Sequence, residues 1–174
     1  MKKRAAGGGR RRLMGAAGIA GAAAVVAGAV LAGRVAGGQG VSVPEDYRSW
    51  NHVKSMVIFE GHPLSGTFGG IHHVYVNDVG RATYEAGKTA PFPDGTVIIF
   101  DLLEADEGEH VLTEGARKLT GMMVKNAALH GETGGWGYYA FDAAGAPLAI
   151  DPAGCHACHE QAAGTDHVFS AWRK

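Results

Sequence analysis

The chain has 174 residues, which is enough for a leader and one compact domain. Its formal net charge of -1 conceals an asymmetry, because residues 1–32 hold six Lys or Arg and no Asp or Glu. The remainder holds ten basic and 17 acidic residues, and a domain of net charge -7 is not expected to bind nucleic acid. The only two cysteines lie within one pentapeptide, so a disulfide between them would close too short a loop to stabilise a fold.

The N-terminus has the pattern of an export signal. Residues 1–12 are basic, residues 13–32 are uncharged and apolar, and Val30-Leu31-Ala32 fits a small-x-small cleavage site. We therefore expect a signal peptide over 1–32, a flexible Gly-rich linker over 33–42, a domain over 43–174 and a periplasmic location. The alternative is a membrane anchor, because 20 residues can just span a bilayer. The domain would contact the membrane only if this segment stays uncleaved.

The rest of the chain predicts short helices and strands without an internal repeat. In chain order we expect a helix start at 43–50, a strand at 70–77, a helix over 80–90, a turn at 91–95, strands at 96–103, 118–125 and 135–142, and a short helix after Pro152. The strand at 96–103 is the clearest, because β-branched residues fill its first half. This order predicts an α+β domain, predominantly antiparallel sheet with short flanking helices.

The pentapeptide Cys155-His156-Ala157-Cys158-His159 is C-x-x-C-H, the attachment motif of c-type haem. Two thiols three residues apart can form thioethers with the two vinyl groups on one porphyrin edge. The residue that follows can then direct an imidazole at the iron. We therefore expect one covalently attached haem c, held by Cys155 and Cys158, with His159 as an axial ligand.

Other readings of the two cysteines are less well supported. A structural zinc site would need a second pair of ligands, and no other cysteine exists. A redox dithiol would need a βαβ context, which is absent, and an inert pair would leave the motif unexplained. His156 is expected to be a solvated residue within the motif. His72 and His73 are adjacent on a predicted strand, so only one of them can face the haem.

The chain resembles the cytochrome P-460 and cytochrome c′-β family. After C-x-x-C-H comes Thr165-Asp166, then Val168-Phe169, and upstream PEDYRSW, VYVN and PFPDGTVII stand in the same order as in that family. The resemblance covers about residues 43–172. It implies an antiparallel sheet with flanking helices, a homodimer and a five-coordinate haem.

Within this family, the residues expected opposite the axial histidine favour the c′-β branch. Hydroxylamine-oxidising members carry a cross-linked lysine on the strand after the Asp-Gly-Thr-Val turn, and the matching residue here is Phe100. They also carry a carboxylate on the strand matching residues 119–125, which here holds no Asp or Glu. The c′-β members have an apolar pocket capped by phenylalanine, which Phe100 fits, and Phe68 is a second candidate cap.

Three functions remain open from the sequence. The leading one is binding of small diatomics, NO or CO, for scavenging, storage or sensing. The second is electron transfer to a redox partner, with Met122 or Met123 as a sixth ligand. The third is enzymatic: hydroxylamine oxidation or adventitious peroxidase turnover.

Overall fold

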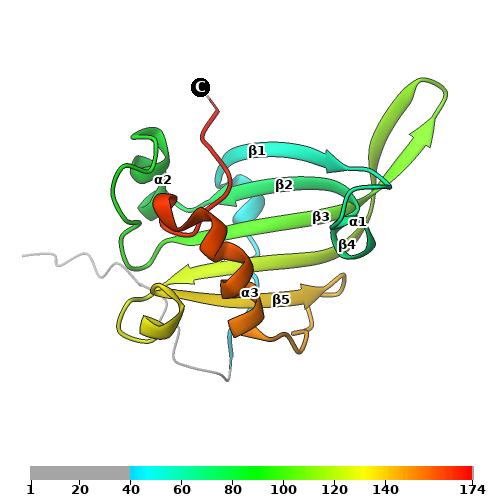
Figure 1. Cartoon of the computed structure of the whole chain (residues 1–174). Helices are drawn as coiled ribbons and strands as arrows, with labels where there is room; N and C mark the ends of the chain where they lie inside the picture. The colour runs from blue at the N-terminus through cyan, green and yellow to red at the C-terminus, as the bar shows by residue number, and fades with distance from the viewer. Residues whose placement is uncertain (1–39, 174) are drawn as a thin grey trace, which may run out of the picture. The chain divides into compact units, whose positions relative to one another are not determined.

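The computed structural model describes residues 40–173, so the expected leader and most of the linker lie outside the described residues. A single antiparallel sheet of five strands in sequence order forms the framework (Figure 1). Its strands are β1 (Asn51–Ile58), β2 (Gly70–Val76), β3 (Val97–Gly108), β4 (Val111–Lys125) and β5 (Trp136–Asp142). The α+β class predicted from the sequence is confirmed.

Short helices surround this sheet. They are η1 (Tyr47–Ser49), α1 (Ser65–Phe68), α2 (Asp78–Glu85), η2 (Gly131–Thr133), α3 (Pro152–His159) and η3 (Glu160–Thr165). Within the described part of the chain, none of them is long and apolar enough to cross a bilayer. The α2 helix begins where the Asn77 side chain accepts a bond from the Gly80 amide at 3.3 Å. Gly80 lets α2 approach β3 closely, because a Cβ there would meet the Thr96 methyl at 2.5 Å.

Both faces of the sheet are covered, which is why neighbouring residues of β3 are buried together. Ile98 packs on one face with α2 and the C-terminal tail, and Ile99 packs on the other with η1 and the N-terminal segment. They are 5% and 0% exposed. Burial on both sides explains why apolar residues stand next to one another in this strand, which the β-branched residues of its first half made clear in the sequence.

Two parts of the sheet were not predicted. β1 carries polar residues, is an edge strand, and its register shifts between His52 and Lys54, so its burial does not alternate cleanly. β3 and β4 also run beyond the predicted 96–103 and 118–125 and form a hairpin that extends past the sheet (Figure 1). Its residues are mostly exposed, so backbone pairing defines it without a hydrophobic pattern.

A buried carboxylate ties this β3 strand to η1 on the face opposite α3. Asp101, 0% exposed, accepts from the Tyr47 hydroxyl at 2.7 Å, from Arg48 Nη2 at 2.8 Å and from Arg117 Nε at 3.0 Å. Both arginine side chains remain partly exposed, so solvent screens the arginine end of each ion pair but does not reach Asp101. The cluster anchors the start of the domain to the middle of the sheet.

Asp101→Asn should lower the free energy of unfolding by about 1.5–3 kcal/mol, because charge-assisted hydrogen bonds are lost at a fully buried carboxylate. Urea denaturation measures this. Glu85→Gln, which breaks the exposed Arg81–Glu85 pair, is the control and should change stability by less than about 0.5 kcal/mol. Equal midpoints for the two variants would contradict the role given to Asp101.

Candidate haem site

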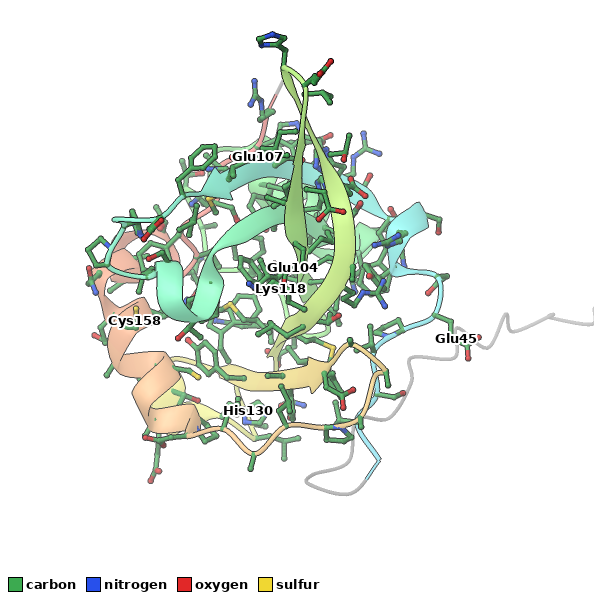
Figure 2. The ribbon with its side chains drawn as sticks, turned by 90° about the vertical axis from the view of Figure 1, so that its right-hand side faces the viewer. Glu45, Glu104, Glu107, Lys118, His130 and Cys158 are labelled. Carbon is green, nitrogen blue, oxygen red and sulfur yellow. The ribbon has the colours of Figure 1, made fainter. Side chains whose placement is uncertain are left out.

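The C-x-x-C-H motif occupies α3, which crosses one face of the sheet and contacts β5 (Figure 1). Pro152 stands in the first helical turn, and the Asp151 side chain caps the helix by accepting from the Ala153 amide at 3.1 Å. Within the helix, Cys155, Cys158 and His159 lie at spacings of three and four residues and share one face. Cys158, labelled on α3 in Figure 2, is exposed, whereas Cys155 is half-buried and packs against the apolar cluster on the sheet.

His159 is fixed in the tautomer that an iron ligand requires. Its Nδ1 lies 2.7 Å from the His167 carbonyl oxygen, which can only accept, so Nδ1 carries the proton and Nε2 keeps its lone pair. Burial lowers the pKa of His159 and outweighs the opposing effect of this hydrogen bond, so the ring is neutral at pH 7. A histidine whose second nitrogen donates to a carbonyl is the usual form of a metal-binding imidazole.

The carbonyl that orients His159 is held in place by Asp166. The Asp166 carboxylate accepts from Lys125 Nζ at 2.8 Å and from the Phe92 amide at 2.8 Å, and its own carbonyl accepts from the Trp136 indole at 2.9 Å. Asp166 and His167 both take left-handed backbone conformations, with φ of 53° and 63°. These contacts outweigh that cost and turn the chain back over α3.

The two predicted cap residues lie together on the α3 side of the sheet. Phe68, from α1, meets the Phe100 ring of β3 edge to face with centroids 5.8 Å apart. Phe100 packs against the same apolar cluster as Cys155, and both phenylalanines are half-buried. Gly121 lies opposite Phe100 in the register and leaves the space beside its ring free of a side chain. The structure thus brings the two cap residues together.

His72 lies beside Phe68 and Phe100, but it was not among the site residues predicted from the sequence. It is 1% exposed, lies edge-on to Phe100 with centroids 4.5 Å apart, and donates from Nε2 to the Phe68 carbonyl. Its Nδ1 is therefore an unprotonated acceptor, buried without a partner. Its neighbour His73 lies on the opposite face beside Glu114, as the alternation of a strand requires. The prediction that only one of the pair can face this side is confirmed.

The structure also separates the two methionines proposed as sixth ligands. Met122 is 4% exposed and packs on the face away from α3, with Ile99 and Phe141. Met123 packs on the α3 side, next to the cluster that holds Cys155. Only Met123 is on the side where an iron ligand could act.

The residues on this face fit a haem. One helical face presents two free thiols and a neutral imidazole with an available nitrogen. Tyr138, whose ring centroid is 5.1 Å from that of His159, has a buried hydroxyl with no hydrogen-bond partner. Buried polar atoms nearly always have a hydrogen-bond partner, so this hydroxyl indicates that a bound group is missing here. His156 was predicted to be solvated, and this prediction is wrong: its side chain is only 16% exposed and pairs with Glu160.

A comparison with protein families matches the model named Cytochrome P460 to residues 44–170. The match covers most of the chain, and the chain belongs to the cytochrome P460 family. This membership indicates a c-type haem protein, in agreement with the site on α3. No curated protein matches the chain.

Replacing both Cys155 and Cys158 by Ser should abolish covalent attachment of haem, because the chain has no other thiol to form thioether bonds. Acid-acetone extraction of the purified protein measures attachment. Gln161→Ala, next to the motif on an exposed position, is a control that should keep the haem. Haem that resists extraction in the double serine variant would refute the attachment.

Proposed function

We propose that this protein is a periplasmic mono-haem cytochrome of the c′-β type that binds NO or CO at an open iron site. Cys155 and Cys158 hold the haem through thioethers, and His159 supplies one axial bond. The opposite side of the iron faces Phe100 and Phe68. The function is scavenging, storage or sensing of a diatomic gas.

The observation that carries this proposal is the pairing of two phenylalanines with a histidine that has no proton to offer. Bound oxygen gains from a hydrogen-bond donor beside it, whereas NO and CO bind ferrous haem without one. The one proton of neutral His72 is used on the Phe68 carbonyl, and the Phe100 ring covers the imidazole edge. The group of Phe68, Phe100 and His72 therefore offers no free donor, which favours NO and CO over oxygen on that side.

Conversion of hydroxylamine is less well supported by the residues of β3 and β4. Phe100 stands where the resemblance places the cross-linked lysine, and no acidic residue lies between 119 and 125. The two lysines of β4 are engaged elsewhere: Lys118 donates to the Gly69 carbonyl at 3.0 Å, and Lys125 pairs with Asp166. Neither Lys118 nor Lys125 is therefore free to form the cross-link.

Electron transfer remains the second candidate function, and Met123 is the residue that favours it. A thioether on the α3 side of the sheet could bind iron where the gas would bind, and the acidic domain would then require a basic redox partner. We also propose that the protein is a homodimer, as the resemblance implies, and that residues 1–32 direct its export.

Phe100→Ala should speed CO association with the reduced protein, because removing the ring opens the route to the iron. The half-buried ring also contributes to stability, at up to about 3–5 kcal/mol for a fully packed Phe, so folding is checked by circular dichroism. Tyr139→Ala, which removes a half-buried aromatic ring from the opposite face, is the matched control and should leave the CO rate unchanged. Stopped-flow absorption measures both rates.

A folded Phe100→Ala protein that binds CO at the wild-type rate would show that Phe100 is only part of the core. In that case the ring does not lie on the ligand's path. Phe100→Leu, which removes less volume, should give an intermediate rate and guards against a folding failure of the alanine variant.

The protein should not oxidise hydroxylamine at a useful rate, because both residues that the resemblance requires for that reaction are absent. Reduction of an electron acceptor by hydroxylamine measures the activity. Turnover at rates typical of active family members would contradict the proposal. The variant with both Cys155 and Cys158 replaced by Ser serves as the haem-free control. Equal turnover by this variant would show that the activity comes from a contaminant.

A further inference from the structure

Three side chains that the haem site does not use gather beside α3. His156 Nε2 lies 2.9 Å from Glu160 Oε1, and His167 Nδ1 lies 3.4 Å from the same oxygen. One ligand atom from each residue lies within 4.8 Å of the other two. His156 and Glu160 are four residues apart on the helical segment, and His167 comes from the tail that folds back over it.

The cluster differs from a chance meeting of surface charges. The imidazole side chains are only 16% and 14% exposed. His167 Nδ1 is buried and forms no hydrogen bond, although it lies 3.4 Å from the Glu160 oxygen. The backbone directs it there: His167 has a φ of 63°, and Gly134 admits its ring, because a Cβ at Gly134 would meet His167 Nε2 at 2.4 Å. A buried nitrogen with a free lone pair needs a partner.

The ligand chemistry selects one class of cation. Two imidazole nitrogens and one carboxylate oxygen suit Zn²⁺ and its late first-row neighbours, whereas Mg²⁺ and Ca²⁺ prefer oxygen alone. Tetrahedral ligands at about 2.0–2.2 Å from zinc stand about 3.3–3.5 Å apart. The separation between His167 Nδ1 and Glu160 Oε1, 3.4 Å, lies in that range, and the separation between His156 Nε2 and the same oxygen, 2.9 Å, is shorter. Glu160, with a side chain 54% exposed, is free to move away from His156, and the ligand atoms of the two histidines lie within 4.8 Å of each other.

We propose that His156, Glu160 and His167 form a second metal site, which binds one Zn²⁺ and leaves a fourth position for water. The site is distinct from the haem iron and does not depend on the proposed gas binding. Its position has a structural consequence, because the carbonyl of His167 accepts the hydrogen bond from His159. A cation bound to the His167 ring fixes the same residue that orients the imidazole of the haem motif.

The test is a zinc titration of the full-length haem-loaded protein after removal of metals with EDTA. Haem-loaded protein is required because free cysteines also bind zinc. Isothermal titration calorimetry should give one Zn²⁺ per chain. His167→Asn should weaken the affinity by at least about tenfold, since even a lost outer-shell partner costs 10–100-fold. Asn tolerates the left-handed backbone at this position, so the fold is kept.

The chain offers a matched control. His110 is exposed and also has a positive φ, of 58°, so His110→Asn makes the same chemical change at a comparable backbone position outside the cluster. It should bind zinc like the wild type. Glu160→Gln, at an exposed position that does not affect folding, should weaken binding as His167→Asn does.

Several results would overturn the site. Wild-type protein that binds no zinc, or binds it without a 1:1 endpoint, would do so. Affinities of His167→Asn and Glu160→Gln equal to that of His110→Asn would show that the zinc binds elsewhere. A 1:1 endpoint lost in both cluster variants and kept in the control supports the site.

Discussion

The ion pair between Asp166 and Lys125 holds the C-terminal tail to the sheet, and the geometry of the haem motif depends on it. The pair is almost fully buried, with side chains 12% and 7% exposed. Removing one partner of a buried pair costs about 3–5 kcal/mol, so the tail is strongly held. Because Asp166 is fixed, the next residue, His167, presents its carbonyl to His159 and its ring to Glu160. One anchor therefore positions both the haem imidazole and the proposed zinc ligand.

The sheet and α1 contribute the residues proposed to lie opposite His159. β2 and β3 place His72 and Phe100 in contact, and α1 adds Phe68 through its side chain and its carbonyl. This group consists of two aromatic rings and a histidine that can accept but not donate. Apolar walls of this kind exclude water and disfavour a polar sixth ligand, because burying an unpaired polar group is costly. The arrangement supports the proposed binding of neutral diatomics.

The sequence predicted those features whose physical cause is local. The strand at 96–103 was clear because β-branched residues fill its first half, and the haem motif was clear because its spacing is fixed by one helical turn. The edge strand β1 and the tip of the β3–β4 hairpin were missed, because backbone pairing defines them without an apolar pattern. The role of His72 depends on its contact with Phe100 of the neighbouring strand, and that of His167 depends on a left-handed backbone, and no local pattern reveals either.

The visible spectrum of the reduced protein, recorded with and without CO, tests the central claim most directly. If His159 is the only protein ligand to the iron, the reduced haem is five-coordinate and high-spin, with a broad visible band, and CO converts it to a sharp low-spin spectrum with a shifted Soret maximum. A reduced protein that already shows the sharp bands of six-coordinate low-spin haem, unchanged by CO, would contradict the claim. Met123 would then be the sixth ligand and the protein an electron carrier.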